Sequence, residues 1–209
     1  MLTNVYVDGF NLYYGCLKDS PYKWLDLNAL CHQLLPRHEI HRIRYFTAKI
    51  SARLPDLQSP IRQETYLRAL ETLPGLTVHL GHFLTGVTRM RLVTPSLNGP
   101  KTVEVIKTEE KGSDVNLATY LVADAFRHDA DIYVLISNDS DLFAPMRLVR
   151  HELDFRVGLI NPHLAKKRSR ALLSCEPTFF KQIRPNTLAK CQFPDQIVSN
   201  SGVITRPIT

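Results

Sequence analysis

The sequence predicts an α/β fold, in which helices cover a central, mostly parallel β-sheet. Short apolar runs alternate along the chain with longer stretches of helical periodicity, as in proteins built from strand–helix–strand units. The run Ile132–Ile136 is apolar at every position, which is typical of a strand buried on both faces. Aspartates follow two of these runs within a few residues, at the strand ends where open α/β sheets form their sites. We therefore expect a site at the carboxyl edge of the sheet.

The first half of the chain is expected to alternate strands with helices. Alternating or continuous apolar residues predict the strands, and apolar residues three or four positions apart predict the helices. The helix expected over Pro60–Leu73 has Ser59 at its N-cap, Pro60 at its first position and Pro74-Gly75 after its end. The expected strands are Leu2–Val7, Ile43–Ile50 and Thr77–Phe83, and the expected helices are Asn11–Leu17, Leu27–Leu35 and Pro60–Leu73.

A basic β-hairpin insertion is expected in the middle of the chain. The β-rich segments Val87–Thr94 and Lys101–Lys107 flank a turn-rich stretch, Pro95–Pro100. Arg89 and Arg91 make the first segment basic. These cations are candidates to guide a nucleic-acid backbone.

The second half continues the alternation and ends in a basic region. We expect helices at Ser113–Phe126 and Leu142–His151, strands at Ile132–Ile136 and Phe155–Ile160, and a basic helix at His163–Leu173 that carries Lys166, Lys167 and Arg168. Beyond Pro185 the pattern is polar with scattered prolines, which predicts a loose tail. The expected organisation is a domain over residues 1–175 and a partly irregular C-terminal extension over 176–209.

The charge of the 209-residue chain is unevenly distributed. Residues 1–141 hold 15 Lys/Arg and 16 Asp/Glu, whereas residues 142–209 hold 11 and 4, so the net charge of +6 arises after the last clustered aspartate. An acidic site beside a basic flank suits a polyanionic substrate. The sequence contains no apolar stretch of membrane-spanning length and no signal-peptide pattern, so we expect a cytoplasmic protein that does not bind membranes.

Four aspartates form the candidate site: Asp8, Asp114, Asp139 and Asp141. Each has a local structural explanation as a turn residue, a helix cap or an acid at a helix N-terminus. As a set near buried strands they are costly unless cations neutralise them. Carboxylate oxygens are the preferred ligands of Mg²⁺ and Mn²⁺, and ions held by acids can activate a water against a phosphodiester.

Other enzymes that rely on acids or nucleotides fit the sequence less well. The first acid lies in Asp8-Gly9-Phe10 rather than in the Asp-x-Asp motif of dehalogenase-type phosphatases. The acidic pair of response-regulator receivers is absent, as are a phosphate-binding P-loop and a dinucleotide-binding glycine fingerprint.

Three segments of the chain resemble the NYN domain family within the PIN-like nucleases, in the family's order: Val5–Leu12, Lys111–Ala118 and Val134–Leu142. The resemblance covers roughly residues 2–161. It implies a three-layer α/β/α sandwich and metal-dependent cleavage of RNA with Mg²⁺ or Mn²⁺. Asp8, Asp114, Asp139 and Asp141 match the acidic metal-binding set. Asn11 matches the asparagine one turn after the first acid, and Ser137 matches the hydroxyl residue before the last acids. Asn138 replaces a frequent glycine, whose left-handed conformation it can adopt.

The leading hypothesis is a metal-dependent ribonuclease that acts on RNA, expected to be single-stranded, and that could form a homodimer. As metal ligands we rank Asp8 and Asp139 first, Asp141 next, and Asp114 last, acting through water. Lys111 is a candidate phosphate contact, with an exposed loop lysine as the alternative.

Two other hypotheses remain open. One is an RNA-binding or regulatory module whose nuclease site is weak or unused. The other is a PIN-like scaffold recruited to small-molecule metabolism, in which Tyr6, Phe10 and Tyr13 line an apolar pocket rather than packing in the core.

Overall fold

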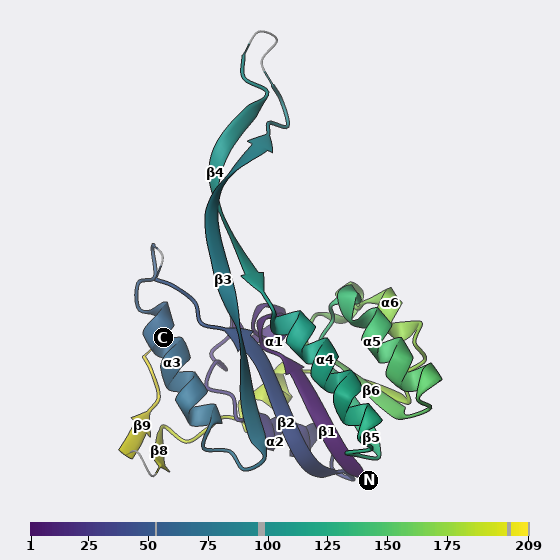
Figure 1. Ribbon diagram of the computed structural model, residues 1–209. Helices are drawn as coiled ribbons and strands as arrows, with labels where there is room; N and C mark the ends of the chain where they lie inside the picture. The colour runs from purple at the N-terminus through teal and green to yellow at the C-terminus, as the bar shows by residue number, and fades with distance from the viewer. Residues whose placement is uncertain (53, 96–98, 200–201, 209) are drawn as a thin grey trace.

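A seven-stranded sheet runs through the molecule in the order β4-β3-β2-β1-β5-β6-β7 (Figure 1). The computed structural model describes residues 1–52, 54–95, 99–199 and 202–208. All strand pairs of this sheet are parallel except β3 with β4, which confirms the predicted α/β class. The strands are β1 (Leu2–Asp8), β2 (Glu39–Ala48), β3 (Leu76–Arg91), β4 (Thr102–Lys111), β5 (Ile132–Ile136), β6 (Arg156–Asn161) and β7 (Phe179–Gln182).

Helices cover both faces of the sheet and give the three expected layers (Figure 1). On one face lie α1 (Gly9–Leu12), the π-helix η1 (Tyr13–Leu17), α2 (Leu27–Leu34), α3 (Ser59–Leu70) and α7 (Pro185–Lys190). On the other face lie α4 (Ser113–Phe126), the 3-10 helix η2 (Ser140–Leu142), α5 (Phe143–Arg147), the π-helix η3 (Leu148–Glu152) and α6 (Arg170–Leu173). Among the described residues, no helix has the length and apolar character needed to cross a membrane.

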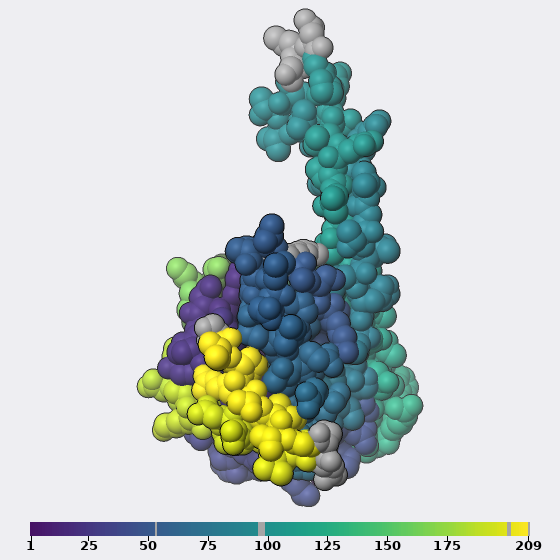
Figure 2. Space-filling model, turned by 90° about the vertical axis from the view of Figure 1, so that its left-hand side faces the viewer, coloured from purple at the N-terminus to yellow at the C-terminus, as the bar shows by residue number. Residues whose placement is uncertain are grey.

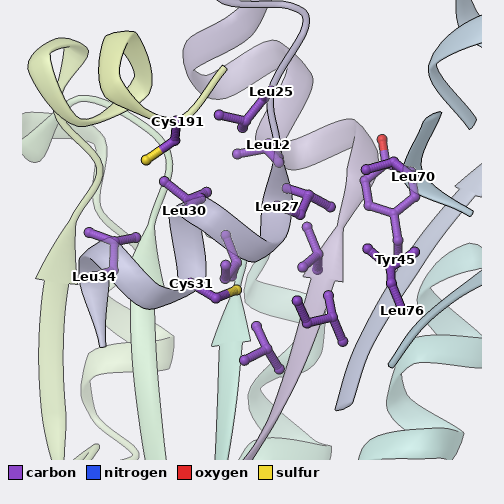
Figure 3. Packing of buried hydrophobic residues seen from close by; sticks show 14 of the residues in the cluster. Leu12, Leu25, Leu27, Leu30, Cys31, Leu34, Tyr45, Leu70, Leu76 and Cys191 are labelled. Atoms are coloured by element: carbon purple, nitrogen blue, oxygen red, sulfur yellow. The ribbon is translucent and has the colours of Figure 1, made fainter. Parts of the chain in front are cut away.

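The core beneath α2 shows how the apolar pattern produces this layer. Leu27, Leu30 and Leu34 recur at helical spacing, so they share one face of α2 and are buried. Figure 3 shows these three leucines on α2. They belong to one buried cluster with Val5 and Val7 of β1, whose i, i+2 spacing places both on the same face of the strand.

The strand order reverses between β1 and β5. The chain builds β2, β3 and β4 outward on one side of β1, then returns to place β5 on its other side and continues outward to β7. Ligands in open α/β sheets bind at such a switch point, beyond the carboxyl ends of the strands. Asp8 ends β1, and Ser137 follows the last residue of β5, so both lie at this crevice.

The expected hairpin is longer than predicted. The segments Thr77–Phe83 and Val87–Thr94 were expected as separate strands, but β3 is continuous from Leu76 to Arg91. It pairs with β2 as far as Gly81, then with β4 from His82 to Arg91, so an antiparallel arm extends away from the sheet (Figure 1). The centre of the expected turn, residues 96–98, lies outside the described residues.

Two local predictions are wrong. Ser59 does not cap α3: the N-cap position is Gln58, and the Ser59 hydroxyl donates to the Asp56 carbonyl instead. The basic helix expected over His163–Leu173 is broken into the 3-10 helix η4 (Ala165–Lys167) and the short α6. Arg168 has a ψ of 139°, and the Ser169 hydroxyl caps a new helix by accepting from the Leu172 amide.

The segment after Pro185 is folded rather than loose. It contains α7 and a hairpin of β8 (Gln196–Ser199) and β9 (Gly202–Thr205). The ring centroids of Phe193 and Trp24 lie 5.5 Å apart, and Ile204 is buried. Figure 2 shows this segment, in yellow, lying across the blue and purple parts of the chain. The domain boundary at residue 175 stays a prediction, although β7 joins the sheet just after it.

Candidate metal centre

Asp8 is fixed at the junction of β1 and α1. It is the N-cap of α1, where its Oδ1 accepts a 2.8 Å hydrogen bond from the Asn11 amide. Its side chain is only 5% exposed. The turn into α1 needs a glycine next, because a Cβ at Gly9 would lie 2.7 Å from the carbonyl oxygen of Phe46. The aspartate is therefore held in one position by backbone geometry and packing.

Ser137 connects the first acid to the loop after β5. Its hydroxyl donates to Asp8 Oδ2 at 2.8 Å and accepts from the Asp139 amide at 3.0 Å. Asp139 is in turn the N-cap of η2, where its Oδ1 accepts from the Asp141 amide at 3.0 Å. One buried hydroxyl thus sets the position of Asp8 and orients the loop that carries Asp139.

Asp114 reaches the same place from the start of α4. Gly112 turns the chain from β4 into this helix. Its φ of 98° is a left-handed conformation that favours glycine. The Glu110 carboxylate accepts from both the amide and the hydroxyl of Ser113, at 3.0 and 2.8 Å. These contacts hold the first turn of α4, where Asp114 lies, against the carboxyl edge of the sheet.

The structure brings together Asp8, Asp114 and Asp139. One carboxylate oxygen from each lies within 4.8 Å of the others, a separation that one divalent cation can bridge. Burial, with added repulsion from Asp114 and Asp139, raises the pKa of Asp8 to about 7. Burial, followed by the charge of Asp139, raises the pKa of Asp114 to about 6. The three carboxylates carry like charges and repel one another. Because a cation would relieve this repulsion, the cluster fits a divalent metal.

Asp141 lies at the edge of this cluster rather than in it. It is exposed, and it is not one of the three acids whose oxygens lie together. Its charge still contributes to the raised pKa of Asp114. The expected ranking placed Asp141 ahead of Asp114, whereas the geometry places Asp114 with Asp8 and Asp139.

The model of the family described as NYN domain matches residues 2–183, nearly the whole chain. The chain belongs to the NYN domain family. The expected resemblance over residues 2–161 is confirmed, and the match extends through β7. This NYN domain therefore has a PIN-like nuclease scaffold, and the acids that its fold brings together can hold a divalent metal.

The chain is similar in sequence to one named protein and in fold to one solved structure. It is 34% identical to 6-hydroxy-3-succinoylpyridine 3-monooxygenase HspA of Pseudomonas putida (strain DSM 28022 / S16), over 97% of this chain and 73% of that protein. A crystal structure of a protein of unknown function from Vibrio parahaemolyticus RIMD 2210633 has the same fold. Its TM-score is 0.58 at 17% identity, over 88% of this chain and 94% of that one.

Asn138 has a role that sequence reasoning missed. It does not adopt the left-handed conformation expected for a glycine replacement, since it is not among the residues with positive φ. Its backbone amide donates to Asn11 Oδ1 at 2.9 Å. Its side chain donates to the Lys167 carbonyl at 2.8 Å and accepts from the Ser169 amide at 2.6 Å. Asn138 thereby ties the basic segment to the loop of Asp139.

The basic residues predicted to contact RNA differ in whether an acidic side chain already pairs with them. Lys166, Lys167 and Arg168 are exposed, on the segment that Asn138 anchors. On the arm, Arg89 pairs with Glu104 at 2.9 Å, while Arg91 is exposed. Lys111, the candidate phosphate contact, pairs with Glu109 at 3.2 Å. The segment 166–168 is thus joined, through the hydrogen bonds of Asn138, to the loop that carries Asp139.

Proposed function

We propose that this NYN domain is a metal-dependent ribonuclease that hydrolyses phosphodiester bonds of single-stranded RNA with Mg²⁺ or Mn²⁺. The observation that carries this proposal is the convergence of Asp8, Asp114 and Asp139 at the switch point of the sheet. Hard divalent ions prefer such oxygen donors. The family match over residues 2–183 supports a nuclease rather than a purely structural acid cluster.

Each residue has a defined part in this proposal. Asp8, Asp114 and Asp139 would hold the ion, which supplies Lewis acidity that activates a water and stabilises the leaving oxygen of the phosphodiester. Ser137 keeps the Asp8 carboxylate oriented through its 2.8 Å hydrogen bond. Lys166, Lys167 and Arg168 would bind the RNA backbone next to the acids, because Asn138 fixes their segment to the Asp139 loop.

Cleavage of end-labelled single-stranded RNA in Mn²⁺, in Mg²⁺ and in EDTA tests this proposal. We expect cleavage by the wild type only with a metal, and loss of at least about a hundredfold in rate for Asp139→Asn, which removes one ligand charge. Asp154→Asn is the matched control, because Asp154 is 97% exposed and lies on the loop before β6, away from the acids. Full activity of Asp139→Asn, or equal loss in both variants, would contradict the proposal.

A second candidate is oxygenation of a small aromatic compound. The observation that favours it is the 34% identity, over 97% of this chain, to a protein named as a 3-monooxygenase of 6-hydroxy-3-succinoylpyridine. Oxygen uptake in the presence of that compound and reduced nicotinamide nucleotide tests this candidate. Oxygen uptake by the wild type in proportion to the compound added, together with no RNA cleavage in the presence of Mg²⁺ or Mn²⁺, would favour the second function over the first.

A further inference from the structure

A cavity of about 330 Å³ is bordered by α1 and η1, the helices that follow Asp8. Gly9 and Phe10, which directly follow Asp8, line it together with the N-terminal part of α3. Its size is within the range of small-molecule sites in proteins. The C-terminal segment closes one side, since Arg206 and Pro207 also line it.

Six aromatic rings line this cavity: Phe10, Tyr13, Tyr14, Trp24, Tyr45 and Tyr66. Trp24 and Tyr45 are almost fully buried, while Tyr13 and Tyr14 are 37% and 61% exposed. The rings of Tyr13 and Tyr14 are edge-to-face at 5.3 Å, and those of Tyr45 and Tyr66 at 6.4 Å. The fully buried Tyr6 instead donates to Asp124, so only two of the three aromatics expected around a pocket line it.

The charges around the cavity are mainly positive. Lys18, Lys23, Arg62 and Arg206 line it. Arg62 pairs with Asp56, the single acid of the lining, and Arg206 pairs with Asp195 outside it, which leaves the two lysines. Lys23 is half-buried, and in the described part of the chain it has neither a hydrogen-bond nor an ion-pair partner. A lysine without a partner in the wall of an aromatic cavity favours an anion as its ligand.

We propose that this cavity binds a planar aromatic heterocycle that carries an anionic group. Rings on several sides favour stacking and edge contacts with a flat π-system, and Lys23 favours a phosphate or carboxylate attached to it. Two sources share this chemistry: a nucleotide of single-stranded RNA with its base unstacked, and a free aromatic acid. The cavity therefore provides a recognition site separate from the acids, and it does not depend on either proposed activity.

Trp24 makes the binding measurable, because it is the only tryptophan of the chain and lines the cavity. Its fluorescence is followed during titration with adenosine 5′-monophosphate and, separately, with pyridine-3-carboxylate. Saturable quenching by either compound is expected. Tighter binding of adenosine 5′-monophosphate indicates a nucleotide as the natural ligand, and tighter binding of pyridine-3-carboxylate indicates a free aromatic acid. Cyclohexanecarboxylate and inorganic phosphate lack the π-system, so each should bind at least about tenfold more weakly than the better aromatic ligand.

Two variants with matched controls locate the site. Lys23→Met and Tyr13→Leu should each weaken binding about tenfold, because they remove the cation and one exposed ring. Lys190→Met makes the same change as Lys23→Met, and Phe126→Leu likewise removes an exposed aromatic ring; neither position lines the cavity, so both variants should bind like the wild type. The inference is overturned if neither aromatic compound quenches saturably, if cyclohexanecarboxylate binds equally well, or if the cavity variants match their controls. RNA cleavage measured on the same preparations separates this outcome from that of the nuclease.

Discussion

The hydroxyl of Ser137 donates a 2.8 Å hydrogen bond to Oδ2 of Asp8, joining residues 129 positions apart in the sequence. The bond crosses the switch point between β1 and β5 and connects the two strands that deliver acids to the candidate metal centre. The same oxygen accepts from the Asp139 amide at 3.0 Å. The geometry of two of the three clustered acids thus depends on one buried hydroxyl.

Replacing Ser137 by alanine should weaken metal binding without unfolding the chain. The change removes the donor to Asp8 Oδ2 and the acceptor of the Asp139 amide, so both acids lose orientation. Loss of such an outer contact lowers metal affinity or activity by about 10- to 100-fold. Calorimetric titration with Mn²⁺ measures the affinity. Ser174→Ala is the control, because the Ser174 hydroxyl only donates to a helix carbonyl at an exposed position. Equal Mn²⁺ affinity in both variants would refute the role of Ser137.

The stability of the metal-free protein should fall as the pH rises from about 4 to 7. Burial raises the pKa of Asp8 from 3.8 to about 7, so the folded chain keeps a proton that the unfolded chain has lost. The folded state then binds more protons across this window, and the free energy of unfolding decreases with pH. Asp8→Asn lacks this titration, so its stability relative to the wild type should increase by up to about 4 kcal/mol between pH 4 and 8. Urea unfolding in EDTA at both pH values measures the difference, and a constant difference would contradict the raised pKa.

Mn²⁺ should stabilise the wild type more strongly at pH 8 than at pH 5. The ion binds ionised carboxylates, whereas Asp8 and Asp114, with pKa values of about 7 and about 6, are largely protonated at pH 5. A ligand that binds only the folded state at 100 times its Kd adds about 2.7 kcal/mol of stability. Thermal unfolding with and without Mn²⁺ tests this expectation. An equal shift in melting temperature at both pH values, or an undiminished shift in Asp114→Asn at pH 8, would count against a metal at these acids.

Asn138→Ala should weaken RNA binding while leaving Mn²⁺ binding nearly unchanged. The substitution removes the side-chain bonds to the Lys167 carbonyl and the Ser169 amide, which releases the basic segment from the acids. The backbone bond to Asn11 remains. Two hydrogen bonds of about 1 kcal/mol each correspond to a loss of up to about 30-fold in RNA affinity. Fluorescence anisotropy with labelled RNA in Ca²⁺ measures it. The exposed Asn186→Ala on α7 is the control, and a result equal to it would contradict the anchoring role.

The segment 166–168 should contribute more to RNA binding than the arm. Changing Lys166, Lys167 and Arg168 to glutamine should reduce the slope of log affinity against log salt by about 2, or roughly 0.7 per phosphate contact. Changing Arg89 and Arg91 should reduce it less, because Arg89 is already paired with Glu104. Binding curves at several salt concentrations decide between the two surfaces. A larger change of the salt slope in the arm variant would indicate that RNA binds along the β3–β4 arm instead.

Asp124 shows a buried acid that serves the fold rather than a site. It is fully buried, and its carboxylate accepts from Arg44 at 2.8 and 3.0 Å and from the Tyr6 hydroxyl at 2.8 Å. Asp124→Ala should cost about 3–5 kcal/mol of stability, because it leaves the Arg44 charge buried without its partner. Glu152→Ala, which removes a surface pair with Arg147, should cost less than about 1 kcal/mol. Chemical denaturation of both variants measures the contrast, and similar costs would contradict this reading of Asp124.

Much of the fold follows from local pattern. The continuous apolar run of β5 and the helical periodicity of α4 predicted both elements with their observed bounds, because burial on one or both faces dictates those patterns. The tail was misjudged because the buried Phe193 and Ile204 make isolated contacts with distant residues and show no local period. The length of β3 was missed since its outer half pairs only with β4, and many of its side chains there remain exposed.

Part of the candidate metal centre could be predicted from the expected order of strands and helices. Asp8 and Asp139 follow strands whose carboxyl ends meet at one edge of the sheet, so their convergence follows from topology. The relative positions of Asp114 and Asp141 depend on how α4 and η2 begin. Gly112, Glu110 and Ser113 set the start of α4, and the Asp139 cap sets the start of η2. Asn138 was missed because its partners, Lys167 and Ser169, lie about 30 residues further along the chain.

The central proposal, that a divalent ion held by the clustered acids would act on the scissile phosphodiester, is tested most directly with phosphorothioate RNA. One non-bridging oxygen of the scissile phosphate is replaced by sulfur, and the cleavage rate is measured in Mg²⁺, Mn²⁺ and Cd²⁺. Because Mg²⁺ binds oxygen far better than sulfur, one stereoisomer should be cleaved about tenfold or more slowly in Mg²⁺, and Mn²⁺ or Cd²⁺ should restore the rate. Equal slowing in all three metals, or cleavage that persists in EDTA, would contradict the claim.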